Sequence, residues 1–469
     1  MGSEVSYVKI GDHSIVYSGF SFKSKDLGGG GIPVVKIKNV KNRTVNLSDT
    51  QFFPEHLITD KHDKFYLKNG DVLIAMTGQG SVGRVGRLNI KDNYQVLLNQ
   101  RVGKFEVNPS LDLRYLYYIL SSKYYKDILF NAASGSGQPN LSPSIISNIE
   151  IPFVNINQQK AIAHILGSLD DKIELNRQIN KTLESMAQAL FKSWFVDFDP
   201  VIDNAIAAGN PIPEPLQARA AKRVAWISDS AIREQNQTIS KQFPSEFEFN
   251  EEMGWIPKGW VVMSIEDVTS NIIDHRGKTP KKLGGEWSKS GYPAISAKNV
   301  KARRIVRPDT IRFVDEDMYR KWMKIPLEKG DIAMTSEAPL GELYYFHSKP
   351  NYLLSQRLYG IRANKMVCSG SYLFHWLQTN TASSDLLNRA TGTTVTGIRQ
   401  SELRQVKILC ASRNVIDSFS TTAEEHLAKI DSNEQSNINL EKLRDTLLPK
   451  LLSGEIRIPD AEKLIAEAT

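Results

Sequence analysis

The strongest constraint on the fold of this chain is an internal repeat, because its second half resembles its first half. Residues 173–184 (IELNRQINKTLE) align with residues 430–441 (IDSNEQSNINLE). Upstream, residues 38–40 (KNV) align with residues 298–300 (KNV), at an offset only slightly longer. A repeat of this length with small loop insertions predicts two copies of one domain within the 469 residues.

Each copy ends in a segment with the apolar spacing of a coiled-coil helix. From Ile162 to Trp194, apolar residues and two asparagines alternate at three- and four-residue intervals. That spacing is the heptad seam of a helix that packs on a partner helix, and it is narrower than the apolar stripe of a surface helix. The same spacing recurs from Phe419 to Leu451. We expect the two helices to pack on each other in antiparallel fashion.

The second helix is the less regular of the two. His426 and Arg444 occupy positions in its seam, where apolar side chains are usual. Pro449 lacks a backbone N–H and is expected to kink or end the helix. Gly454 is a natural stop signal.

Two asparagines occupy matching seam positions in each helix. Buried asparagines in a coiled-coil seam fix the register of the helices at some cost in stability. The alternative is that these positions are polar turns that face solvent. The asparagines are Asn176 and Asn180 in the first copy and Asn433 and Asn437 in the second.

The predicted fold class is α+β. Two tandem mixed α/β domains are expected to be separated by two long antiparallel helices, which form a coiled-coil spacer with pseudo-two-fold symmetry. Short strand-like runs and glycine-rich turns fill each mixed domain. The expected boundaries are 1–153 for the first domain, 154–198 for the first helical spacer, 199–250 for a connector without sustained periodicity, 251–410 for the second domain, 411–455 for the second spacer and 456–469 for a C-terminal tail.

Composition excludes several classes of protein. The chain is 41% hydrophobic and 24% charged, and it has no apolar run of the roughly 18 residues that a membrane span needs. Its start has no signal segment, so secretion is not expected. Cys368 and Cys410 are predicted to be buried or neutral residues rather than a disulfide or metal site. The net charge of +7 and pI near 9.0 favour a polyanionic partner.

The sequence offers no convincing catalytic motif. Residues 78–83 match G-x-G-x-x-G, but no helix opening follows, and the second copy (336–341) keeps only the last glycine, which favours a turn between strands. Residues 277–279 (GKT) resemble the end of a P-loop, yet Ile272 stands where its first glycine is required. The histidines show no metal-binding spacing. We therefore predict no catalytic residue and no metal site, and a role in recognition or scaffolding.

Basic, amide and hydroxyl residues recur at matched places in the two copies. Arg, Lys, Asn and Gln reach base edges, while Ser and Thr hydroxyls hold phosphates, so the pattern indicates a DNA-binding surface. Each residue taken alone is better explained as an ordinary solvated strand or turn residue, so the matched positions favour a binding surface only as a set; clustered cations would also suit RNA or an acidic protein. The predicted DNA-binding residues are Lys36, Lys38, Asn39, Arg84, Arg87, Gln100, Arg101, Ser136 and Gln138 in the first copy, and Lys278, Lys298, Asn299, Arg303, Arg304, Gln356, Arg357, Thr393, Thr394 and Arg399 in the second.

Taken together, these features resemble a known family. The segments that carry the resemblance are 255–260 (WIPKGW), 274–280 (DHRGKTP), the loop at 135–138 (GSGQ), and the helical region from 157 to 176 that closes with 194–200 (WFVDFDP). With its duplication, the whole chain resembles a specificity subunit of a type I DNA restriction–modification system. It departs from the pattern in its amino terminus, which lacks the Pro-Lys-Gly-Trp opening of the second copy.

The resemblance implies two target-recognition domains, each reading one half of an asymmetric, bipartite site in double-stranded DNA. The paired helices would act as a ruler and dock two modification (methyltransferase) subunits and restriction subunits. The resemblance implies that those partners use S-adenosylmethionine, ATP and Mg²⁺, and that this chain itself binds no cofactor. It also implies a cytoplasmic location in a prokaryotic cell, with no membrane partner.

Two other functions stay open at the level of sequence. One is an enzyme, a self-contained DNA methyltransferase or nuclease whose motifs are unrecognised. The other is an antirestriction or scaffolding protein that keeps the helices but reads no DNA sequence.

Overall fold

The chain forms two compact units in the computed structural model, which describes residues 6–91, 93–133, 139–227, 239–392 and 395–468. Unit 1 comprises Met1–Asn176 and Gln435–Thr469, and unit 2 comprises Arg177–Glu434. The division runs through both long helices. Each unit therefore contains one mixed domain together with a segment of each helix.

Unit 1 contains two small sheets. The larger has the order β2-β9-β6-β7-β4, in which only β4 lies parallel to its neighbour, and the smaller has the order β5-β3-β8. A two-stranded pair, β1 with β10, joins the ends of the domain. The strands are β1 Ser6–Lys9, β2 Ser14–Ser18, β3 Ile32–Val35, β4 Arg43–Thr44, β5 Gln51–Phe53, β6 Val72–Ala75, β7 Val85–Arg87, β8 Leu97–Leu98, β9 Val102–Val107 and β10 Glu150–Phe153; the short helices are α1 Ile10–His13, α2 Leu113–Ser121, α3 Lys123–Ala132 and α4 Pro143–Ser147.

Unit 2 repeats this arrangement with a few additions. Its sheets are β14-β22-β19-β20 and β18-β15-β21, with the pairs β13-β23, β16-β17 and β11-β12 beside them. The strands are β11 Phe247–Asn250, β12 Gly254–Pro257, β13 Val261–Ser264, β14 Thr269–Asp274, β15 Tyr292–Ile295, β16 Val300–Lys301, β17 Arg304–Ile305, β18 Arg312–Val314, β19 Ile332–Thr335, β20 Leu343–Tyr345, β21 Leu353–Leu354, β22 Leu358–Ala363 and β23 Lys407–Cys410. The helices are α9 Ile265–Val268, α10 Glu316–Trp322, α11 Gly370–Trp376, α12 Asn380–Asn388 and α13 Gln400–Arg404, and short 3₁₀ helices in the two units lie at Ser24–Asp26, Glu55–Leu57, Asp60–Phe65, Lys281–Leu283, Ala297–Asn299 and Pro308–Thr310.

The two mixed domains are structural copies, as the repeat predicted. The order β2-β9-β6-β7 corresponds to β14-β22-β19-β20, and in both three-stranded sheets the central strand is antiparallel to one neighbour and parallel to the other. Small details recur as well. The carboxylate of Asp71 accepts the backbone N–H of Lys68 at 2.8 Å, and Asp331 accepts that of Glu328 at the same distance.

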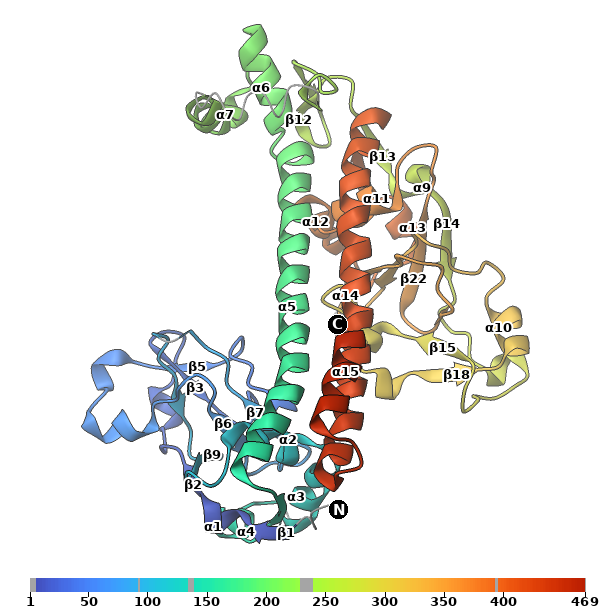
Figure 1. Cartoon of the computed structure of the whole chain (residues 1–469). Helices are drawn as coiled ribbons and strands as arrows, with labels where there is room; N and C mark the ends of the chain where they lie inside the picture. Colours follow the sequence, from blue (N-terminus) through green and yellow to red (C-terminus); the bar gives the residue numbers. More distant parts are fainter. Residues whose placement is uncertain (1–5, 92, 134–138, 228–238, 393–394, 469) are drawn as a thin grey trace. The chain divides into compact units, whose positions relative to one another are not determined.

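The two predicted long helices are α5 (Ile156–Phe195) and α14 (Arg413–Ser453) (Figure 1). Asn155 caps α5, because its Oδ1 accepts the backbone N–H of Gln158 at 3.0 Å. Pro449 lies inside α14, so of the two effects expected of it, a kink or an end of the helix, the second does not occur. The buried Leu448 and Leu451 hold this last turn in the core of unit 1, and Gly454, at a φ of 74°, follows the final helical residue.

The helices pack in antiparallel fashion along the predicted seam. In unit 1, Nδ2 of Asn176 donates to Oδ1 of Asn437 at 2.9 Å; in unit 2, Nδ2 of Asn433 donates to Oδ1 of Asn180 at 2.7 Å. All four asparagines are buried, so they are not polar turns that face solvent. Asn180 follows Asn176 in α5, whereas its partner Asn433 precedes Asn437 in α14, as antiparallel packing requires.

The two irregular seam residues have different surroundings. Arg444 is buried in unit 1, where its guanidinium donates to Asp170 at 2.5 Å and to its neighbour Asp445 at 3.0 Å. The charge in the seam is therefore neutralised by carboxylates. His426, in unit 2, is half-buried.

In both units the helix seam continues into the core of the mixed domain. In unit 1, Ile162 and Leu166 of α5 and Leu447 of α14 belong to the same apolar cluster as Tyr115 of α2 and Ile74 of β6. In unit 2, an aromatic cluster fills the equivalent place; its members include Phe191, Trp194, Phe195, Tyr372 and Phe419. Each domain is thus anchored to both helices by apolar burial.

The two segments named only as a connector and a C-terminal tail contain helices. The connector contains α6 (Asp199–Ala208) and α7 (Glu214–Ile227). An ion pair links the two helices, since Arg219 of α7 donates to both carboxylate oxygens of Asp199 of α6. The C-terminal tail forms α15 (Ile458–Ala468), whose Ala461 lies in the core of unit 1. Their stability comes from these tertiary contacts, which a short sequence pattern does not reveal.

Within the residues that the structure describes, no helix is both long and apolar enough to cross a bilayer. Cys368 and Cys410 are free and buried, as predicted, and burial raises the pKa of each thiol to about 12. Across the same described ranges, no group of three or more His, Cys, Asp or Glu side chains could hold a metal ion.

Candidate nucleic-acid interface

One loop is built in the same way in both domains, around a buried asparagine. Asn39 accepts the backbone N–H of Lys36 at 2.9 Å and donates to the carbonyl of Asn46 at 3.0 Å. Its counterpart Asn299 accepts the N–H of Ser296 at 3.1 Å and donates to the carbonyl of Val306 at 3.2 Å. These amides are engaged inside the domain and are not presented to a ligand. The prediction that they contact DNA is therefore corrected: they shape the loop instead.

The lysines beside these asparagines are accessible. Lys38 and Lys298 are exposed, and Lys38 pairs with Asp49 at 3.0 Å. Lys36 is half-buried and donates to Gln51; burial, reinforced by the charge of Lys38, lowers its pKa. Both copies thus place an exposed ammonium group next to a loop that an internal amide holds in shape.

In unit 2, Lys298 lines a hollow of about 370 Å³, which we call the basic hollow. Four of the predicted DNA-binding residues meet there, although they come from three separate stretches of sequence. The polar and aromatic lining residues considered below are Lys278, Lys298, Gln356, Arg357, Arg312 and Trp287.

The side chains of the basic hollow are held in several ways. The guanidinium of Arg312 stacks over the Trp287 ring at 4.1 Å, a cation–π contact. Nζ of Lys278 donates to the carbonyl of Trp322 at 3.1 Å. Arg357, with a φ of 64°, pairs with Glu337 at 2.8 Å while its side chain stays about half exposed. The hollow therefore carries an excess of cations, several of which already have a fixed direction.

Sequence reasoning missed Arg312. It considered cations that recur in both copies, and the strand register places the uncharged Gln51 at the corresponding position of the first domain. Arg312 is the first residue of β18, and only the pairing of β18 with β15, the strand that leads to Lys298, brings it to the hollow.

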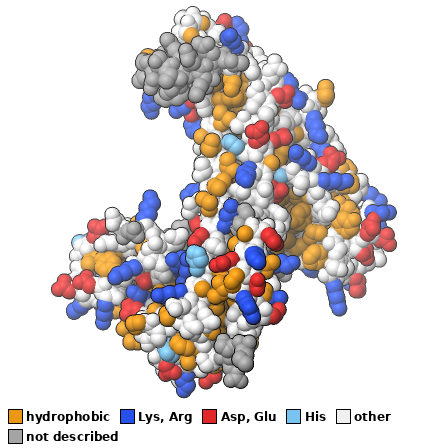
Figure 2. Space-filling view, viewed as in Figure 1, with side chains coloured by type: hydrophobic (Ala, Val, Ile, Leu, Met, Phe, Trp, Pro, Cys, Tyr) orange, Lys and Arg blue, Asp and Glu red, His pale blue; other side chains and the backbone are white. Residues whose placement is uncertain are grey.

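In unit 1 the counterparts of Gln356 and Arg357 are Gln100 and Arg101, which are exposed at the turn between β8 and β9. Arg84 and Arg87 are half-buried at β7. Figure 2 shows Lys and Arg side chains gathered on the face of unit 1 over the region of β3, β5 and β7. The first domain thus also presents a basic face.

The remaining predicted residues fall elsewhere. Ser136, Gln138, Thr393 and Thr394 lie outside the described residues. Arg399 is exposed immediately before α13 and does not line the basic hollow.

Arg303 and Arg304 do not point to the basic hollow. Arg303 pairs with Glu184 of α5 at 2.7 Å, and Arg304 pairs with Glu434 of α14 at 3.0 Å. Their guanidinium groups join the domain to the helices, and a contact of these two residues with DNA stays a prediction.

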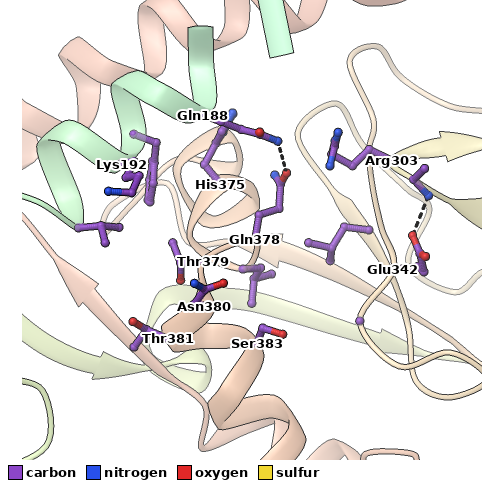
Figure 3. A pocket seen from close by; sticks show the side chains of 16 residues that line it. Gln188, Lys192, Arg303, Glu342, His375, Gln378, Thr379, Asn380, Thr381 and Ser383 are labelled. Carbon is purple, nitrogen blue, oxygen red and sulfur yellow. Dashed lines mark hydrogen bonds between the residues drawn. The ribbon is translucent and has the colours of Figure 1, made fainter. Parts of the chain in front are cut away.

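A second hollow in unit 2, of about 530 Å³, lies between α5 and the α11–α12 corner (Figure 3). Gln188 donates to Gln378 across it at 3.3 Å, and Lys192 is paired with Asp197. His375, at its edge, bonds to the carbonyl of Ser371, and burial lowers its pKa to about 4. Some polar side chains of this hollow are thus already paired, either within the lining, as Gln188 with Gln378, or with a neighbouring residue, as Lys192 with Asp197.

Known proteins resemble this chain along most of its length. The profile of the type I restriction modification DNA specificity domain matches residues 2–185 and 257–410. The chain is 30% identical over 414 residues to the type I restriction enzyme HindI specificity subunit of Haemophilus influenzae, covering 83% of this chain and 87% of that protein. It is 25% identical over 452 residues to the type I restriction enzyme MjaIX specificity subunit of Methanocaldococcus jannaschii, covering 94% and 90%.

A solved structure shares the fold. The crystal structure of a type I restriction-modification system S subunit from M. genitalium matches with a TM-score of 0.52 at 15% identity, covering 96% of this chain and 97% of that chain.

Proposed function

This chain belongs to the specificity-subunit family of type I restriction–modification systems, and we propose that it reads a two-part, asymmetric site in double-stranded DNA. Its role is DNA sequence specificity and not catalysis, so the alternative of a self-contained methyltransferase or nuclease is set aside. Each mixed domain, called a recognition domain from here on, reads one half of the site.

The observation that carries this proposal is the basic hollow. It gathers Lys298, Gln356 and Arg357 from loops that have counterparts at the same places in the first domain. Arg and Gln form bidentate hydrogen bonds with base edges, and Lys neutralises phosphates. A duplicated loop set of this chemistry supports two equivalent DNA readers within one chain.

The ion pair between Arg357 and Glu337 adds a selective element. At 2.8 Å, with a half-exposed guanidinium, it holds Arg357 in place before DNA arrives. DNA that offers the guanidinium two acceptors, as guanine does through O6 and N7, replaces the carboxylate in this pairing. DNA that offers fewer acceptors leaves the Glu337 carboxylate near a phosphate or base acceptor, which is unfavourable.

The helix pair supports a defined gap between the half-sites. Helices α5 and α14 each belong to both units, and both carry the buried asparagines that fix register. Their exposed faces are also the surface on which two modification subunits and, in a restricting complex, restriction subunits dock. Those partners supply S-adenosylmethionine, ATP and Mg²⁺ chemistry. This chain binds no cofactor, and the complex works in the prokaryotic cytoplasm.

The proposal is tested with a variant of the basic hollow, Lys298→Ala with Arg357→Ala, assembled with the modification subunits. Methylated sites are then mapped in a DNA library. We expect the base preference of one half-site to relax while that of the other stays unchanged, with a cost of about 1–3 kcal/mol per lost base contact.

The matched control is Arg320→Ala, which removes an exposed arginine of α10 that pairs with Glu316 and does not line the basic hollow. If the double variant keeps full selectivity at both half-sites, the basic hollow does not read DNA. If selectivity falls equally at both, the two recognition domains do not act independently.

A further inference from the structure

An arginine occupies the same loop position in both recognition domains and has the same unusual backbone conformation. Arg43 has a φ of 69° and Arg303 a φ of 62°. Each follows the asparagine-built loop by four residues, with Asn39 before one and Asn299 before the other. Non-glycine residues with positive φ carry strain and persist where the surrounding structure requires them. The recurrence in both copies indicates that this conformation serves a purpose common to the two domains.

In unit 1 the side chain of Arg43 reaches a long helix. Its Nη2 pairs with Asp445 of α14 at 2.7 Å, and its Nη1 donates to Ser121 at 3.1 Å. The hydroxyl of Tyr117 donates to the carbonyl of Arg43 at 2.9 Å, which fixes the backbone of the same residue. The arginine side chain is 15% exposed and that of Asp445 is 54% exposed, so the pair lies at the edge of the protein surface with its cation largely covered.

In unit 2 the equivalent arginine makes the equivalent kind of contact. Nη2 of Arg303 pairs with Glu184 of α5 at 2.7 Å. The next residue, Arg304, pairs with Glu184 at 3.5 Å and with Glu434 of α14 at 3.0 Å. The second domain is thus tied to both helices by charge-assisted bonds.

Each arginine pairs with the long helix that does not directly follow its own domain in the chain. The first domain is covalently continuous with α5, yet Arg43 pairs with α14; the second is continuous with α14, yet Arg303 pairs with α5. A domain joined to one helix by the chain alone retains freedom to rotate about that junction. A directional bond to the other helix, added to the apolar contacts, removes that freedom because guanidinium–carboxylate pairs demand a narrow geometry.

We propose that Arg43 and Arg303 are positioning residues that fix the orientation of each recognition domain on the helix pair and thereby restrict the gap between half-sites. This inference rests on the proposed function. Adjacent base pairs are separated by about 3.4 Å along the duplex. A domain that can swing by a few ångströms therefore accepts a gap that is one base pair longer or shorter. The arginines touch no base in this role, so they govern the gap and not the bases read.

The test selects DNA from a library that varies both the half-site bases and the gap length, using the full chain assembled with its modification subunits. The variants are Arg43→Ala and Arg303→Ala, with Asp445→Ala and Glu184→Ala removing these pairs from the helix side; Asp445→Ala also removes the contact with Arg444, and Glu184→Ala that with Arg304. We expect unchanged base preference in both half-sites, and a preference for the native gap over gaps shifted by one base pair that falls roughly tenfold. The control is Arg320→Ala, whose ion pair with Glu316 lies within one helix.

Arg43→Lys keeps a cation near Asp445 without disturbing the contact of Asp445 with Arg444, and it is expected to keep much of the gap preference. Circular dichroism confirms that each variant is folded. Unchanged gap preference in both arginine variants and both carboxylate variants would overturn the inference alone. Loss of base preference in one half-site in the arginine variants, but not in the carboxylate variants, would also overturn it, because the arginines would then contact DNA. A wild-type chain that selects no two-part site would instead overturn the proposed function.

Discussion

The buried asparagine pair of unit 2 allows the packing of the helix seam to be tested quantitatively. Asn433 donates to Asn180 at 2.7 Å, and Asn180 in turn donates to the carbonyl of Ile430 at 3.4 Å. Both side chains are buried. Asn180→Leu removes the acceptor and leaves the Asn433 amide buried without a partner. Leaving such a group unsatisfied costs about 1–3 kcal/mol of unfolding free energy.

The double variant Asn180→Leu with Asn433→Leu behaves differently. It leaves no unsatisfied amide, and each leucine gains roughly 1.5–3 kcal/mol from burial, offset by about 1–3 kcal/mol of crowding in the seam. The double variant is therefore expected to be close to wild type in stability, although each single variant is destabilised. The coupling free energy in the double-mutant cycle is then at least about 1 kcal/mol in favour of the double variant.

Tryptophan fluorescence during urea unfolding is a suitable assay, because all seven tryptophans of the sequence lie between residues 177 and 434, in unit 2. The matched control is the pair Asn176 and Asn437, which bond to each other in unit 1. Replacing these two by leucine should leave the tryptophan transition within about 0.5 kcal/mol of wild type if the units unfold separately. Single variants as stable as wild type, or purely additive effects, would refute the account of the seam.

Two further predictions concern buried charge. Burial, followed by the charge of Lys278, lowers the pKa of His275 to about 4. The folded state thus favours the neutral imidazole. The contribution of His275 to the unfolding free energy is fully present above the unfolded pKa near 6.5 and is lost as the pH falls towards 4. Between pH 7 and pH 5 wild type should therefore lose about 2 kcal/mol more unfolding free energy than His275→Gln; equal losses in urea titrations would contradict this. Arg444→Leu should destabilise unit 1 by about 3 kcal/mol, because Asp170 then remains without its cation. Circular dichroism melts check it against Arg413→Ala, an exposed arginine of the same helix, and a loss no larger than that control would count against it.

The features that sequence predicted well are those written in short, local patterns. The heptad spacing from Ile162 to Trp194 gave the long helix and its antiparallel partner, since periodicity depends only on the backbone geometry of a helix. The repeat predicted two equivalent sheets, which the matched strand orders confirm. The turn at residues 78–83 joins β6 to β7, as expected from the loss of its glycines in the second copy.

The features that sequence did not predict depend on what a side chain meets in three dimensions. Asn299 and Arg303 belong to the same basic and polar stretch as Lys298, yet only Lys298 faces the basic hollow. Composition cannot separate a cation that binds a partner from one that binds a carboxylate of its own chain. Likewise α15 is stable because Ala461 packs in the core of unit 1, and its sequence alone resembles a tail.

The central claim is that the helix pair sets the distance between two independent DNA readers. Inserting one heptad into α5 and a matched heptad into α14 lengthens the pair by about 10 Å, at 1.5 Å per residue. Mapping methylated sites with the assembled complex should show both half-sites unchanged and the gap longer by about three base pairs, at 3.4 Å each. An unchanged gap in a folded, active complex would contradict the claim.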